Sequence, residues 1–130
     1  MRRIHLAFGI LGLLAFAATG RMMRAHIPPM DQLGDGVRLM YRSRHIYLLG
    51  SAVANTLLGL YLVPGRELWR WCVQSVGSIL FLASTVLLGL AFLAEGGHGL
   101  DHTWRSSFGL YALFAGTLLH FVGAVGDENG

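Results

Sequence analysis

The sequence contains no lysine, a single cysteine (Cys72) and few charged side chains of any kind. Charged residues make up 13% of the 130 residues, whereas a soluble domain usually has about 25%. One cysteine cannot form a disulfide within the chain or supply a multi-cysteine zinc or iron–sulfur site. Because 54% of the residues are hydrophobic, a chain of this length cannot hide its apolar surface from water. The composition therefore argues against a soluble enzyme or a disordered tail and indicates an integral membrane protein.

Four long apolar stretches alternate with short segments that carry arginine, glycine or proline. A helix needs about 20 apolar residues to cross a bilayer, and barrel strands would alternate polar with apolar residues. We therefore predict an all-α membrane protein, a four-transmembrane-helix bundle. It forms a single integral membrane domain, 1–130, with a long loop at 21–45 and spans at about 4–20, 46–63, 71–94 and 108–126. The first stretch also fits a secretory signal, and we expect it to be retained as a helix.

The arginines are shared unequally between the two predicted membrane faces. Six of the ten lie in 21–45 and 95–105, and four lie in the N-terminal segment and 64–70. Under the positive-inside rule this distribution favours a cytoplasmic position for the loops 21–45 and 95–105. Insertion in both orientations stays open. We expect a multi-pass protein of the bacterial inner membrane.

Small and polar side chains recur on one face of each predicted helix. Hydrocarbon supplies no hydrophobic force between helices, so helices associate where small residues let their backbones approach. The predicted helix-packing residues are Gly9, Gly12, Gly109, Gly116 and Gly123, and we expect the last three to support self-association. The predicted intramembrane polar residues are Asn55, Gln74 and His120, which we expect to join helices by hydrogen bonds. Such a face would otherwise line a pore or a ligand cavity.

Acidic and basic residues are absent from the deep part of every predicted span. Proton-coupled transporters generally carry an intramembrane carboxylate, so this pattern argues against a small multidrug antiporter. His5 and His120 fall on one membrane face, and each lies on the glycine side of its helix. Two such histidines are able to ligate haem or a metal. We expect His5 at headgroup depth, where hydrogen bonds to water or backbone are the simpler role.

The segment after the third span holds the densest set of potential metal ligands. It comprises Glu95, His98, Asp101 and His102, and imidazoles with carboxylates suit zinc or copper, with His45 available to complete the shell. The alternative is a solvated loop in which Asp101 caps the fourth helix, with Thr103 as the competing cap. We predict no cofactor. A zinc or copper ion bound by this loop is the alternative.

Arg38, Arg42 and Arg44 lie just before the second span, at the expected height of the lipid headgroups. Guanidinium groups bind phosphate oxygens bidentately. We expect these arginines to contact anionic lipid. A pocket for an anionic ligand is the alternative.

The segment Arg24-Ala25-His26, with Asp31-Gln32 downstream, resembles the Arg-Ala-His…Glu-Asn signature of the membrane-bound, four-helix glutathione-transferring enzymes. The resemblance covers nine residues, and Pro28-Pro29 interrupts the helix that the signature requires. It implies a glutathione-type enzyme, but no functional residue is assigned from it.

The sequence contains no recognisable catalytic set and no nucleotide-binding motif. We therefore expect a small polytopic membrane protein, not an enzyme, that acts as an oligomeric or accessory interaction subunit. Its expected partners are membrane lipid and either further copies of itself or a larger membrane complex, without nucleic acid. The alternatives are a multi-chain channel or transporter and, less favoured, a membrane-embedded metal, haem or glutathione-type protein.

Overall fold

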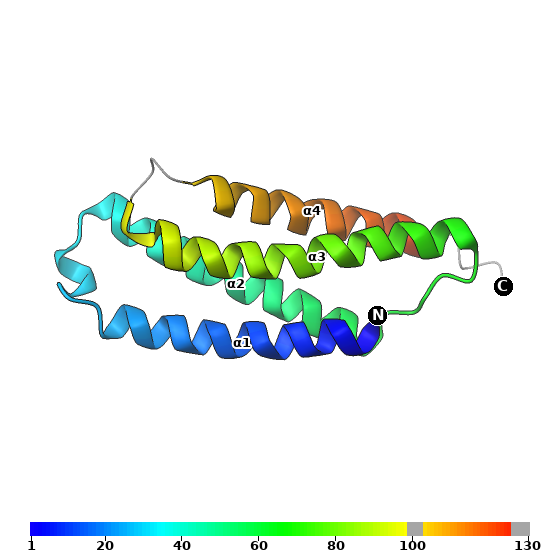
Figure 1. The fold of residues 1–130 in the computed structure, drawn as a ribbon, viewed down its shortest axis with the longest axis horizontal. Helices are drawn as coiled ribbons and strands as arrows, with labels where there is room; N and C mark the ends of the chain where they lie inside the picture. Colours follow the sequence, from blue (N-terminus) through cyan, green and yellow to red (C-terminus); the bar gives the residue numbers. More distant parts are fainter. Residues whose placement is uncertain (99–102, 126–130) are drawn as a thin grey trace.

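The computed structural model describes residues 1–98 and 103–125, and the chain is all-helical there. Four long helices run side by side along the long axis of the molecule, with short 3-10 turns in two of the connections (Figure 1). The elements in chain order are α1 (Arg2–Arg24), η1 (Met30–Gln32), α2 (Asp35–Tyr61), α3 (Leu68–Glu95), η2 (Gly96–His98) and α4 (Trp104–Ala124). The predicted all-α bundle is confirmed at this level.

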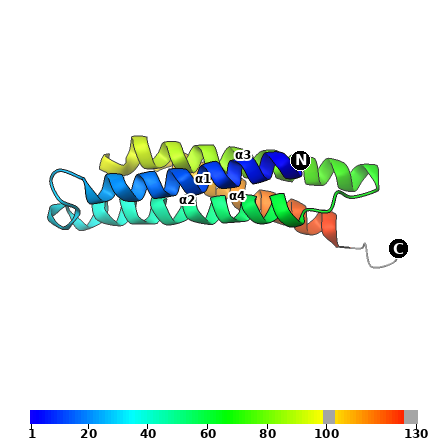
Figure 2. The same cartoon turned by 90° about the horizontal axis from the view of Figure 1, so that it is seen from below.

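The helices form two antiparallel pairs, α1 with α2 and α3 with α4, which meet mainly where α2 contacts α3. Figure 2 shows α1 lying along α2 for nearly its whole length. The start of α1, the ends of α2 and α4 and the start of α3 share one end of the bundle, which we call the terminal end. The opposite end, where 25–34 joins α1 to α2, is the long-loop end.

Local chemistry explains several helix ends. Arg21 and Arg24 lie in the last turn of α1, where positive charge is favourable beside unpaired carbonyl groups. Asp35 begins α2, where a carboxylate is favourable for the converse reason. At the other end of α2, the guanidinium group of Arg2 donates to the carbonyl oxygens of Gly59 and Leu60. This contact ties the start of α1 to the end of α2.

The glycine faces lie at the closest helix contacts within the chain. A Cβ atom added to Gly9 would lie 2.6 Å from the backbone nitrogen of Thr56 on α2. One added to Gly116 would lie 3.0 Å from the carbonyl oxygen of Gly77 on α3. Gly12 is equally close to α2, and Gly109 and Gly123 to α3. The face of α4 that we expected to join separate copies therefore packs against α3 of the same chain.

Polar side chains lie inside the bundle, and most large apolar side chains lie outside it. Among the described residues, twelve polar or charged side chains are buried but only seven hydrophobic ones. Leu14, Ile79, Leu93 and Phe114 are each more than 60% exposed. This distribution is the reverse of a water-soluble bundle, in which apolar residues form the core.

Three of the four helices, α1, α3 and α4, are long and apolar enough to cross a membrane. α2 is not among them, although its 27 residues make it longer than α1 or α4. Its polar residues account for the difference, since Arg44, Ser51 and Asn55 all lie within it and are buried. The prediction of a fourth span therefore stays a prediction.

Candidate functional site

A buried ion pair joins α2 to α3 near the long-loop end. Arg44 and Glu95 are both fully buried, and Nη2 of Arg44 lies 3.3 Å from Oε2 of Glu95. Arg44 also donates from Nη1 to the carbonyl oxygen of Glu95 at 2.8 Å and from Nε to the hydroxyl oxygen of Ser106 at 2.8 Å. Hydrogen bonds of this kind offset the cost of removing two charges from water.

The carboxylate of Glu95 also caps the start of α4. Its Oε1 accepts the backbone N–H of Arg105 at 2.7 Å, and its Oε2 accepts the N–H of Ser106 at 3.3 Å and the hydroxyl of Ser106 at 2.7 Å. The first N–H groups of a helix have no partner within it, so a carboxylate there stabilises the helix. Thr103, the N-cap residue, makes no side-chain cap hydrogen bond. The third helix therefore supplies the cap that we expected from the loop.

The structure corrects two expectations about charged residues. Arg44 was expected to face anionic lipid or an anionic ligand, but it is buried against Glu95 and Ser106. Glu95 was expected in a metal-binding loop, but both of its carboxylate oxygens hold helix ends together. Arg42 is exposed, and Arg38 pairs with Asp35 one turn away on the same helix. Contact of Arg38 and Arg42 with anionic lipid stays a prediction.

The remaining predicted metal ligands are not brought together by the described residues. His45 stacks on Phe16 with ring centroids 3.9 Å apart, and its Nδ1 lies 2.9 Å from the hydroxyl oxygen of Thr19, so it faces α1. Asp101 and His102 lie outside the described residues, as does the side chain of His98. Within the described part of the chain, no group of three or more His, Cys, Asp or Glu residues is placed to hold a metal ion.

A second polar cluster, the histidine cluster, lies towards the terminal end and draws on all four helices. Its centre is Asn55 of α2, whose Oδ1 lies 2.7 Å from Nδ1 of His5 on α1. The amide nitrogen of Asn55 donates to the carbonyl oxygens of Ser51 at 3.1 Å and Phe81 at 3.4 Å and to the hydroxyl of Thr85 at 2.8 Å. These bonds join α1, α2 and α3 around a buried amide.

His120 brings α4 into the histidine cluster. Its Nε2 lies 3.4 Å from the hydroxyl oxygen of Ser78 on α3, and its ring centroid lies 6.0 Å from that of His5. Among the described residues, neither Nε2 of His5 nor Nδ1 of His120 has a hydrogen-bond partner, although both atoms are buried. A buried polar atom without a partner costs about 1–3 kcal/mol. Two such atoms so close together mark this cluster as the candidate functional site.

His5 lies near the start of α1 and is enclosed by the bundle, and its depth in a membrane stays a prediction. Its side chain is fully buried, because α3 extends beyond α1 at the terminal end (Figure 2). The sequence contained a signal for this position, since His5, Gly9 and Gly12 share one helix face. The sequence contained a comparable signal for the burial of Arg44, which shares one face of its helix with Leu48, Ser51 and Asn55.

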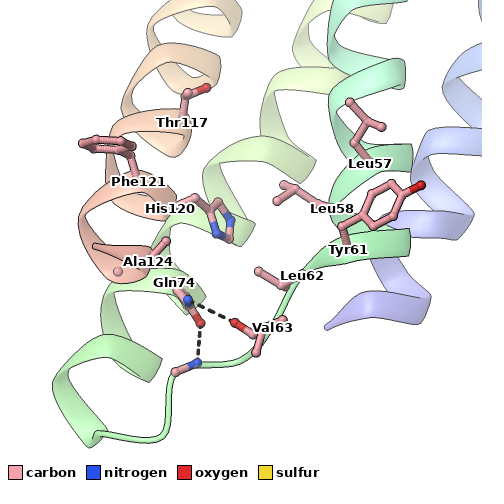
Figure 3. Close-up of a pocket in the computed structure, with 12 residues that line it drawn as sticks. Leu57, Leu58, Tyr61, Leu62, Val63, Gln74, Thr117, His120, Phe121 and Ala124 are labelled. Atoms are coloured by element: carbon pink, nitrogen blue, oxygen red, sulfur yellow. Dashed lines mark hydrogen bonds between the residues drawn. The ribbon is translucent and has the colours of Figure 1, made fainter. Parts of the chain in front are cut away.

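A cavity of about 680 Å³ lies beside His120, between the ends of α2 and α4. Figure 3 shows the imidazole ring of His120 pointing from α4 towards Leu58 and Leu62. Gln74, one of the predicted polar residues, closes one side: it accepts the N–H of Gly65 at 2.8 Å and donates to the carbonyl oxygen of Val63 at 3.3 Å (Figure 3). The other lining residues are mostly apolar, namely Leu57, Tyr61, Phe121, Gly123 and Ala124, with Thr117.

A smaller cavity of about 220 Å³ reaches His5 from the other side, between α1 and α3. Met1, Ile4, Ser75 and Ser78 are among the residues that line it. Each imidazole of the histidine cluster therefore borders a cavity of its own.

Comparison with known proteins gives no match for this chain among family models, curated proteins or solved structures. The function is therefore argued from the geometry of the two buried polar clusters and the apolar outer surface.

Proposed function

We propose that this chain is a four-span protein of the bacterial inner membrane that acts as an oligomeric or accessory subunit within the bilayer. The observation that carries the proposal is the reversed distribution of side chains, with polar groups inside the bundle and large apolar groups outside. In water such a surface would aggregate, whereas in lipid it is solvated by acyl chains. The proposal assigns the chain no reaction of its own.

The packing of α2 supports a fourth span. α2 contacts α1 from Gly59, beside Leu6, to His45, beside Thr19. These contacts cover most of α1, so α1 cannot cross a bilayer without α2 alongside it. The 27 residues of α2 correspond to about 40 Å of helix, which exceeds the hydrocarbon thickness of about 30 Å. Its buried polar groups are satisfied by neighbouring helices and need not face lipid.

The outer face of α4 supplies a surface for a second copy of the chain. An aromatic ridge runs along it, formed by side chains that are 59–69% exposed: Phe108, Tyr111, Phe114, Leu118 and Phe121. Aromatic rings bury a large area with few rotatable bonds, and they often anchor interfaces. Phe121 also lines the larger cavity, so the ridge adjoins a recess that is able to receive a side chain. We propose that the ridge packs against the same ridge of a second copy.

The oligomeric state in lipid nanodiscs tests this proposal, with mass photometry as the readout. We expect the wild-type chain to be an oligomer and the double variant Phe114→Ala/Leu118→Ala to dissociate. The control is Ile10→Ala/Leu14→Ala on the outer face of α1, where both side chains are at least 50% exposed. A monomeric wild type without a co-purifying chain would contradict the proposal, as would equal dissociation of both variants.

A further inference from the structure

The hydrogen bonds of Asn55 determine the protonation of His5. Backbone carbonyl oxygens only accept hydrogen bonds, so the atom of Asn55 that faces the carbonyl oxygens of Ser51 and Phe81 must be the amide nitrogen. The amide oxygen then faces His5, and Nδ1 of His5 must donate to it at 2.7 Å. A neutral imidazole with a proton on Nδ1 carries its lone pair on Nε2. This lone pair is buried and has no partner among the described residues.

The second imidazole is presented from the opposite side of the bundle. The ring centroids of His5 and His120 are 6.0 Å apart, and Nδ1 of His120 is likewise buried without a partner among the described residues. Metal–imidazole bonds are about 2.0–2.1 Å long. A metal ion bound by both rings would lie about 3 Å from each centroid. A centroid separation of 6.0 Å therefore lets both rings reach one ion once their unpartnered nitrogens turn towards it. A donor bond from His5 to a fixed oxygen is also the usual arrangement behind a metal-bound histidine.

The surroundings indicate which metal. The thioether sulfur of Met1 lies 3.9 Å from the hydroxyl oxygen of Ser78, and Met1 and Ser78 line the same small cavity as His5. Imidazole and thioether ligands suit copper(I), whereas calcium and magnesium require several oxygen ligands. The residues that line the two cavities include no carboxylate. Since a buried charge is costly without an opposite charge, a monovalent ion is favoured over a divalent one.

The packing also distinguishes an ion from haem. The ring of Phe81 lies against both imidazoles, with centroids 6.4 Å from His5 and 5.6 Å from His120. Gly77 and Gly116 bring the backbones of α3 and α4 into contact beside them. A porphyrin would have to displace this ring and separate these helices, whereas a single ion requires only rotation of side chains.

We propose that His5 and His120 bind one copper(I) ion within the bundle, with the thioether of Met1 as a further ligand and Asn55 orienting His5. The site lies outside the predicted loop ligands Glu95 and His98 and is independent of the oligomer proposed above. It would give the chain a role in holding or passing a soft metal ion at one face of the membrane.

The test is copper(I) binding by the full chain, purified in detergent without a histidine tag, in competition with the chromophoric chelator bicinchoninate. We expect one ion per wild-type chain and loss of binding in His5→Phe and in His120→Phe. Asn55→Leu should weaken binding by about 10–100-fold, the usual effect of removing a group that orients a ligand. His26→Phe is the matched control, since His26 lies at the long-loop end, where its Nδ1 bonds to the carbonyl oxygen of Pro28.

X-ray absorption of the copper-loaded wild type keeps the proposal testable if a variant fails to fold, as judged by circular dichroism. We expect two nitrogen ligands at about 2.0 Å and a sulfur ligand at about 2.3 Å, with the sulfur replaced by selenium in selenomethionine-labelled protein. Failure of the folded wild type to bind copper(I) would overturn the proposal. So would binding that persists in folded His5→Phe/His120→Phe, a preference for zinc, or loss of the ion in His98→Ala.

Discussion

Arg44 and Glu95 form an ion pair in which both side chains have no exposed surface, and the same carboxylate caps α4. Removal of one partner leaves the other buried and uncompensated, which typically costs about 3–5 kcal/mol. We expect Glu95→Ala to lower the free energy of unfolding by about this amount, measured by denaturant unfolding in detergent micelles. The double variant Arg44→Met/Glu95→Gln should recover part of the loss, because neither fully buried charge then remains and the nearby Arg105 is partly exposed to solvent.

The exposed neighbour Arg42 is the control for this pair. Arg42→Met should change the unfolding free energy by less than about 0.5 kcal/mol, as is usual for surface positions. Equal stabilities of Glu95→Ala and Arg42→Met would mean that the pair does not hold the helices together.

Two glycines should respond to alanine with opposite signs. In Gly116→Ala the new methyl group would lie 2.9 Å from Cδ2 of Phe81 and 3.0 Å from the carbonyl oxygen of Gly77, so α3 and α4 must separate. We expect a loss of about 1–3 kcal/mol, typical of overpacking. Gly89→Ala meets nothing within 4 Å and should stabilise α3 by about 0.5–1 kcal/mol through helix propensity. The midpoint temperature of thermal unfolding should be lower than that of the wild type in Gly116→Ala and higher in Gly89→Ala. A shift of both midpoints in the same direction would contradict the assigned contacts.

Cysteine labelling tests whether α2 crosses the membrane. In a Cys72→Ser background, single cysteines at Gly34 and at exposed Arg66 lie beyond the two ends of α2. We expect a membrane-impermeant maleimide to label them from opposite sides of intact cells or inverted vesicles. The arginine distribution predicts that position 34 faces the cytoplasm. Labelling of both positions from the same side would exclude the fourth span.

Gln74 is expected to fix the connection between α2 and α3. Its amide bonds to the backbone of Val63 and Gly65 would be lost in Gln74→Leu, whereas half-buried Ser75 bonds mainly within its own helix. We expect the backbone amide of Gly65 to exchange its hydrogen several-fold faster in Gln74→Leu than in Ser75→Ala, measured by hydrogen–deuterium exchange. Equal rates would show that other contacts order this connection.

The sequence predicted the four helices because long apolar stretches are themselves the physical signal for helices in lipid. The predicted second span begins at Ile46, where the apolar residues begin. α2 itself begins at Asp35, because a helix continues wherever its backbone and polar side chains find partners. Hydropathy identifies the residues that are able to face lipid. It does not show how far a helix continues beyond the apolar stretch.

The two buried polar clusters could not be predicted as clusters. Arg44 and Glu95 are 51 positions apart and Asn55 and His5 are 50 apart, so nothing local links the members of either pair. Arg44 was assigned to the surface because an arginine beside an apolar stretch usually faces headgroups. Its position on the small and polar face of α2 favoured burial. The prediction followed the charge of the side chain instead.

The dependence of Arg44 on Glu95 also constrains how the protein is made. When the α1–α2 hairpin has left the ribosome, Arg44 has no carboxylate to pair with, because Glu95 follows 51 residues later. A buried charge without its partner is costly, so the packing at the long-loop end of α1 and α2 is completed only after α3 has been synthesised. The first two helices therefore depend on the C-terminal half of the chain for their final contacts.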